Sequence, residues 1–155
     1  MFESTLATTQ DADLILKLYQ LRTEAEMRKA RSWVIGQFFP QTAEEYSAWF
    51  ATCPAEERSW FLQVWSYWEM AAAFVLHGAL NADLFLDCNS EPFLLHAKFQ
   101  HILPEIRQKT PGCMIKVGQL IEQYPEARAK VEQMAKIVPG LRAAAAARKE
   151  LVGKG

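Results

Sequence analysis

Apolar residues recur along most of this chain at intervals of three and four, the spacing that places side chains on one face of an α-helix. From Asp11 or Asp13 onward this pattern predicts one long first helix that ends at Pro40. The middle of that helix, residues 22–31, is mostly charged, so we expect it to project into solvent or to line a polar seam.

The most apolar helix is predicted to have Pro54 in its first turn and to close at His77, with Gly78 as its stop; its apolar part begins at Ser59. Its apolar residues cover nearly every face, which is typical of a helix buried on several sides. One carboxylate, Glu69, lies inside it, and no other charged residue occurs between Arg58 and Asp83. A buried ionisable group needs a partner or loses its charge, so Glu69 is the most informative residue of the chain.

The remaining segments also favour helices. A capping box at Thr42 and Glu45 opens a short helix, and Asn81 is placed to cap another. Pro104 should kink or end a helix predicted over residues 91–107. We see no strand pattern and therefore predict an all-α fold, an irregular bundle of about six or seven helices. Residues 1–140 are predicted to form a single helical domain, followed by a basic, Ala-rich helical tail over residues 141–155.

Charge is distributed unevenly. The whole chain carries −1, but residues 128–155 hold seven Lys or Arg and two acidic residues, a net +5, which leaves −6 on the rest. The overall charge argues against a nucleic-acid-binding domain. The basic tail could instead dock onto the body, onto a second copy of the chain, or onto a polyanion, or it could simply be a solvated helix face.

Composition indicates a cytoplasmic protein. Three isolated cysteines, Cys53, Cys88 and Cys113, form neither a disulfide framework nor a zinc pattern, and we expect them to be reduced. We see no signal peptide in residues 1–10 and no apolar run long enough for a membrane span, so we expect no membrane role.

Two interpretations of Glu69 follow. In the first, Glu69 pairs with an arginine of another helix and fixes how the two longest helices dock, the donors being Arg22, Arg28 or Arg31, or else Arg107. In the second, it is a general acid or a ligand-anchoring carboxylate in a pocket. Such a pocket would bind a small anion, with five candidate ligand-binding residues: Glu69, Tyr67, Arg22, Arg28 and Arg31.

No other group is placed for catalysis or for metal binding. His96 and His101 are five residues apart, which does not put them on one helix face, and His77 is suited to capping a helix end. The run from Asp87 to Glu91 resembles the start of a calcium loop, but Pro92 stands where that loop needs glycine. We therefore expect no catalytic residue, no metal and no cofactor.

Several segments resemble an uncharacterised family of bacterial all-helical proteins, a domain of unknown function. The resemblance lies in residues 67–70, 77–80 and 83–85, and in residues 21–31 of the first helix, and it covers about residues 10–110. It implies a bacterial source but brings no activity, cofactor or catalytic residue. Some members of that family look membrane-tethered at the N-terminus, a feature that we do not see here, and residues beyond Pro125 show no resemblance.

These observations lead to one principal functional expectation. We expect a non-enzymatic helical interaction or regulatory module that self-associates or binds a protein partner, with neither nucleic acid nor a membrane as its main partner. The first alternative is the small-anion binder, or an unusual helical enzyme, at Glu69 and the first-helix arginines. The second is binding of a nucleic acid or an anionic surface through residues 141–155.

Overall fold

Helices account for the fold, as predicted. The computed structural model describes residues 6–155, and within that range it is 79% helical and contains no strand. The helices of the first half are α1 (Thr9–Thr23), α2 (Ala25–Gly36), α3 (Ala43–Thr52), α4 (Ala55–Leu76) and α5 (Ala82–Cys88). Those of the second half are α6 (Glu91–Phe99), α7 (Leu103–Lys109), α8 (Ile115–Gln123), α9 (Pro125–Ala135) and α10 (Val138–Gly153). Six or seven helices was therefore too few.

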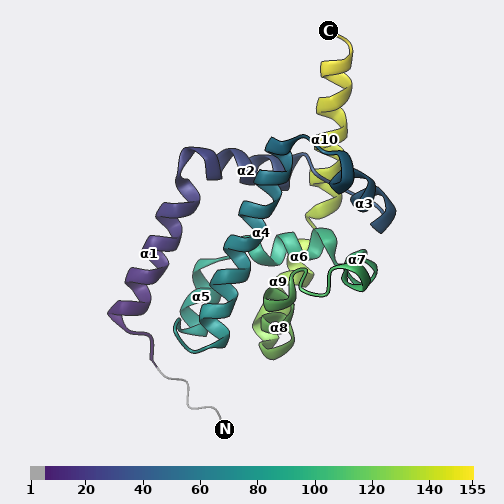
Figure 1. Ribbon diagram of the computed structural model, residues 1–155. Helices are drawn as coiled ribbons and strands as arrows, with labels where there is room; N and C mark the ends of the chain where they lie inside the picture. The colour runs from purple at the N-terminus through teal and green to yellow at the C-terminus, as the bar shows by residue number, and fades with distance from the viewer. Residues whose placement is uncertain (1–5) are drawn as a thin grey trace.

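The predicted long first helix is two helices. Glu24 has φ −59° and ψ 148°, an extended conformation that ends α1, and α2 begins at the next residue. Figure 1 shows α1 turning away from α2 along one side of the molecule. Neither proline nor glycine marks this break, and the Thr23 hydroxyl donates to the Gln20 carbonyl at the end of α1. The start was also misplaced, because Thr8 caps α1 in a capping box with Asp11.

Local signals for helix ends are confirmed elsewhere. Gly78 adopts φ +74° after α4, the left-handed conformation that glycine tolerates best. The Asn81 side chain accepts from the Leu84 amide at the start of α5, and the Thr42 side chain accepts from the Glu45 amide at the start of α3. Pro104 lies in the first turn of α7, so the helix predicted over residues 91–107 is divided in two.

Helix α4 lies at the centre of the fold, and α2 and α8 pack against it (Figure 1). Trp68 and Val64 of α4 are fully buried, together with Phe85, Phe93 and Phe99 from the later helices. One end of the core is a cluster of contacting aromatic rings, at centroid distances of 4.3 to 6.1 Å. Its members come from α2, α3, α4, α6 and the segment after α2: Trp33, Phe38, Tyr46, Trp49, Phe50, Trp60, Phe61, Trp65 and Phe99.

The basic C-terminal segment is only partly separate from the body. Helix α10 begins at Val138, buries Val138 and Ala145, and packs against α2, α6 and α9. Its last turns extend beyond the body of the molecule, where Figure 1 shows the C-terminus standing clear of the other helices. None of the helices in residues 6–155 combines the length and the apolar character that a membrane crossing requires.

Candidate functional site

The Glu69 side chain, on α4, caps the N-terminus of helix α8. One carboxylate oxygen accepts a hydrogen bond from the Lys116 amide and the other from the Val117 amide, each at 3.0 Å. These amides belong to the first turn of α8, where the backbone N–H groups have no partner within their own helix. The negative carboxylate also faces the positive end of the α8 dipole. Glu69 therefore holds α8 against α4.

The predicted pair between Glu69 and an arginine is wrong. Among the described residues, no ion pair joins Glu69 to Arg22, Arg28, Arg31 or Arg107, and Glu69 is only half-buried. Its requirement for a partner was correctly anticipated, but backbone amides meet it. Arg107 lies nearby and binds the chain that leads into α8, because its guanidinium donates to the carbonyls of Cys113 and Met114, both at 2.9 Å.

Arg107 supports a strained residue, Met114, at the point where the chain enters α8. Met114 has φ +47°, a left-handed conformation that is uncommon for a residue with a side chain, and it is 1% exposed. Arg107 binds the Met114 carbonyl, and Glu69 binds the amides two and three residues later. Packing and these bonds together hold the turn, and burial raises the pKa of the neighbouring Cys113 thiol to about 11.

The arginine that does form a buried ion pair is Arg31, and its partner is Glu91. Arg31 Nε lies 3.0 Å from each carboxylate oxygen, and one terminal nitrogen lies 2.6 Å from Oε2. Trp68 Nε1 donates to the same carboxylate at 3.1 Å. The Glu91 side chain is only 9% exposed, and its hydrogen bonds with Arg31, together with its charge, raise the pKa of Arg31 above the ordinary value. This pair joins α2 to the first turn of α6.

Tyr67 and Arg22 bind within the core rather than facing a pocket. The Tyr67 hydroxyl donates to the Leu18 carbonyl of α1, and burial raises the pKa of Tyr67 to about 12. The Arg22 guanidinium lies over the rings of Tyr19 and Trp68, 5.1 and 5.8 Å from their centroids. These contacts fasten α1 to α4.

Two of the predicted site residues do line a cleft. It lies between α2 and α10 and measures about 340 Å³, and it is lined by Arg28, Arg31, Ser32, Ile35, Gly36 and Arg148. Glu69 and Tyr67 line none of the described pockets. The structure therefore separates the five candidate residues into helix contacts and a cationic cleft, and it adds Arg148 of the basic C-terminal segment, which the sequence had not connected with the first-helix arginines.

A buried lysine lies behind this cleft. Lys98 of α6 is 3% exposed, and its ammonium donates to the carbonyls of Val34 and Ile35 at the end of α2. It also lies over the Phe39 ring, 3.9 Å from the centroid. Burial, together with a smaller effect of the Arg142 charge, lowers the pKa of Lys98 to about 7. No feature of the sequence distinguished this lysine from a surface one.

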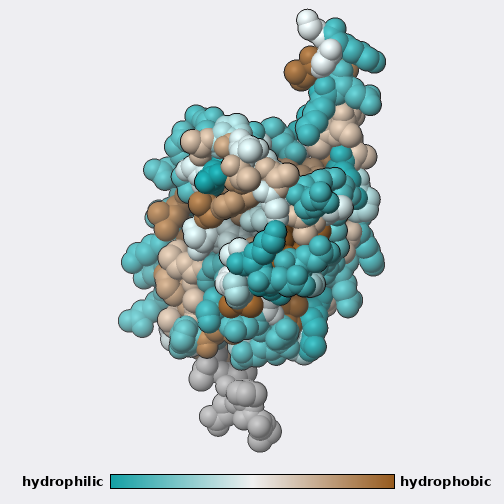
Figure 2. All heavy atoms as spheres, turned by 45° about the vertical axis from the view of Figure 1, so that its right-hand side comes forward, coloured by the Kyte–Doolittle hydropathy of each residue, from teal (hydrophilic) through white to brown (hydrophobic). Residues whose placement is uncertain are grey.

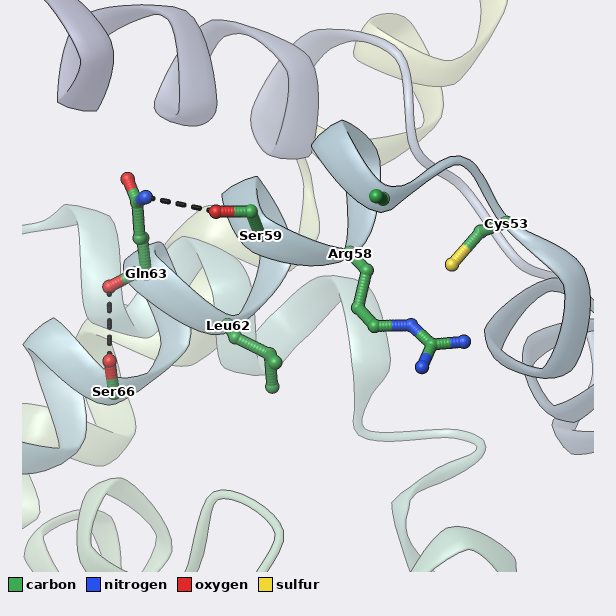
Figure 3. Close-up of a pocket in the computed structure, with 7 residues that line it drawn as sticks. Cys53, Arg58, Ser59, Leu62, Gln63 and Ser66 are labelled. Atoms are coloured by element: carbon green, nitrogen blue, oxygen red, sulfur yellow. Dashed lines mark hydrogen bonds between the residues drawn. The ribbon is translucent and has the colours of Figure 1, made fainter.

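Two adjoining hollows lie along α4 near its start. The larger, about 540 Å³, is lined by both apolar and polar side chains, and Figure 3 shows Arg58 extending across it toward Cys53. Gln63 Nε2 donates to the Ser59 hydroxyl at 3.1 Å, so part of this polar lining is already paired (Figure 3). Leu62 borders both hollows.

The smaller hollow, about 410 Å³, is mainly apolar. Aromatic rings from α3 and α4 line it together with Ile106, Lys109 and Cys113. Its volume falls within the range of small-molecule sites. Burial raises the pKa of the Tyr46 hydroxyl, which therefore stays protonated at neutral pH. The lining offers an apolar surface with few polar groups to orient a ligand.

The histidines contribute no metal site within residues 6–155, where no three His, Cys, Asp or Glu side chains gather closely enough to hold an ion. Burial lowers the pKa of His96 to about 4, and the charge of Arg107 acts in the same direction. His96 therefore remains neutral at physiological pH. His77 is the residue that ends α4, as predicted.

Comparison with known proteins gives one match. A family model described as a domain of unknown function, DUF4760, matches residues 7–135. The match extends further than the expected residues 10–110, and it includes α8 and α9 but not α10. No curated protein and no solved structure matches the chain.

Proposed function

The chain belongs to the DUF4760 family, a domain of unknown function, and we propose from its own geometry that it is a non-enzymatic helical interaction module that self-associates through the end of α10. The observation that carries this proposal is the exposure of Leu151 and Val152, which are 75% and 82% exposed on the projecting end of that helix. Figure 2 shows this end standing clear of the body, with hydrophobic surface beside hydrophilic surface. Large apolar side chains at such a position favour contact with a protein surface.

Charge complementarity supports a second copy as the partner. Residues 128–155 carry +5 and the rest of the chain carries −6, so the basic end of one copy is attracted to the acidic body of another. Exposed carboxylates at the starts of α3 and α4, including Glu44, Glu45 and Glu56, offer such a surface. Lys149 and Lys154 lie on either side of the two apolar residues along the chain and would lie at the polar rim of the contact.

The polar side chains that could have served in catalysis are already bound to other parts of the fold, which supports a non-enzymatic role. Glu69 and Glu91 hold helices together, and Tyr67 binds a backbone carbonyl of α1. Each of these polar groups is committed to a bond that stabilises the fold.

Light scattering on a size-exclusion column tests the proposal. We expect the wild-type mass to exceed that of one chain and to fall toward it on dilution. In the double variant Leu151→Glu, Val152→Glu we expect one chain only, because two carboxylates replace the apolar contact and repel the acidic body. Raising the salt concentration should also weaken the association.

The matched control changes two exposed leucines elsewhere, Leu16→Glu with Leu21→Glu on α1, which are 60% and 53% exposed. This variant should keep the wild-type mass. A wild-type protein that is a single chain at every concentration would overturn the proposal. Equal loss of association in both variants, or in neither, would show that α10 does not carry the contact.

A further inference from the structure

The cationic cleft between α2 and α10 brings together residues from distant parts of the chain. Arg28, Arg31 and Ser32 come from α2, and Arg148 comes from α10. An atom of the Arg148 guanidinium lies 4.0 Å from the position that a Cβ on Gly36 would occupy, so this side chain lies over the end of α2. Arg148 lies outside the matched residues 7–135, so the family match includes only the α2 side of the cleft.

Positive charge at this cleft is largely uncompensated. Arg31 is paired with Glu91, but the guanidinium groups of Arg28 and Arg148 form no hydrogen bond or ion pair with any residue of 6–155. No acidic residue lines the cleft. Two further cations lie close behind it: Lys98, which binds the Ile35 carbonyl of the cleft wall, and Arg142, whose charge acts on Lys98.

Unpaired arginines of this kind are suited to binding anions. A guanidinium presents N–H donors in a planar fork that fits the oxygens of phosphate in pairs. Two such forks line the cleft from different helices, and the Ser32 hydroxyl in the lining is a further donor. A ligand with a single anionic group would satisfy one fork, whereas a diphosphate offers oxygens to both.

We propose that the cleft formed by Arg28, Arg31, Ser32 and Arg148 binds a small molecule that carries a diphosphate group. The volume of about 340 Å³ accommodates a diphosphate with a small substituent. Arg31, whose charge is neutralised by Glu91, forms part of the wall, and the unpaired Arg28 and Arg148 contribute the charge and direct hydrogen bonds. The bound anion draws α10 against α2 and offsets the mutual repulsion of the cations. This binding is independent of the self-association through Leu151 and Val152.

Titration calorimetry with inorganic pyrophosphate tests the assignment on the full chain. We expect saturable binding of one pyrophosphate per chain, tighter than that of orthophosphate. Arg28→Gln and Arg148→Gln should each weaken binding by about tenfold or more, because each removes a charge-assisted contact. Both residues are exposed, and thermal melting will confirm that the variants fold.

Lys149→Gln is the matched control, since it removes the same charge from the neighbouring position and does not line the cleft. It should change the affinity by no more than about twofold, through the general field alone. Absence of pyrophosphate binding to the wild type, or equal weakening by Lys149→Gln and Arg148→Gln, would overturn the proposal. The oligomeric mass of each variant, measured separately, distinguishes this outcome from a failure of the self-association.

A further arm identifies the source of the phosphate. Phosphatidylcholine vesicles containing phosphatidic acid replace pyrophosphate, and sedimentation measures the bound protein. We expect no binding that depends on Arg148, which supports a free diphosphate. Vesicle binding that Arg148→Gln weakens and that pyrophosphate fails to displace would overturn the assignment to a free diphosphate.

Discussion

Glu69 and Glu91 each join two helices, but their carboxylates meet different partners. Glu91, at the start of α6, receives three hydrogen bonds from the Arg31 guanidinium and one from Trp68. Glu69, in the middle of α4, receives two backbone amides at the start of α8 and no counter-charge. A carboxylate removed from water thus finds a partner either in an opposite charge or in the free N–H groups of a helix end.

Lys98 extends this comparison to a cation. Its ammonium binds two carbonyls at the end of α2, where the negative end of the helix dipole lies. Glu69 and Lys98 are therefore partnered in equivalent ways. The negative Glu69 accepts from backbone amides at the start of one helix, and the positive Lys98 donates to backbone carbonyls at the end of another. Arg31 and Glu91 alone form a buried ion pair among residues 6–155. Helix ends therefore partner two of these charged groups, Glu69 and Lys98, and the ion pair partners the other two.

The largest expected effect comes from breaking the ion pair. Arg31→Met should lower the free energy of unfolding by about 3 kcal/mol, because it leaves the Glu91 carboxylate enclosed with Trp68 as its only side-chain donor. Urea denaturation measures the change. Arg28→Met on the same helix removes an exposed arginine and should change stability by less than about 0.5 kcal/mol. Equal effects of the two variants would show that the enclosed pair contributes no more than an unpaired surface charge.

Lys98 gives the second largest effect, and it depends on pH. The pKa of Lys98 is lowered from 10.5 to about 7 by folding, so between those values the unfolded chain binds more protons than the folded one. Stability must then rise with pH in this window. We expect a gain of up to about 2 kcal/mol between pH 7 and pH 9, since the neutral amine keeps two N–H donors for the Val34 and Ile35 carbonyls.

Thermal or urea unfolding at several pH values measures this gain. Lys98→Met is the matched variant, because it keeps the length of the side chain and removes the titrating group. Its stability should change much less between pH 7 and pH 9 than that of the wild type. The same rise in both proteins would assign the pH dependence to other groups and would contradict the picture of an enclosed ammonium.

The helix ends that depend on residues adjacent in the sequence could be predicted from the sequence. Gly78, Asn81 and Thr42 end or begin helices as predicted, because each cap involves atoms within a few positions along the chain. The break at Glu24 was missed because it contains neither proline nor glycine, and the bond that spans it, from the Arg31 guanidinium to the Arg22 carbonyl, joins residues nine positions apart. Such tertiary effects override local propensity.

At the candidate site, too, local features could be predicted from the sequence, whereas contacts between distant segments could not. Glu69 could be recognised as needing a partner from its apolar surroundings alone, but the amides of Lys116 and Val117 carry no side-chain signature. Arg28 and Arg148 are 120 positions apart, and only the packing of α10 against α2 places them in one cleft. Sequence patterns thus indicated which charged side chains need a partner or could bind a ligand, and the packing of the helices determined which groups lie next to them.

The smallest expected effect tests the backbone partner of Glu69. Glu69→Ala should lower the free energy of unfolding by about 1–2 kcal/mol, as does the loss of a helix cap, and Glu69→Gln by roughly half as much, because an amide oxygen can still accept one bond but carries no charge. Hydrogen exchange at the Lys116 and Val117 amides should accelerate in both variants. Glu132→Ala, an exposed position on α9, is the control and should leave both amides protected. If Glu69→Ala lost 3 kcal/mol or more, Glu69 would resemble Glu91 in strength, and the distinction between a helix end and a counter-charge as partner would disappear.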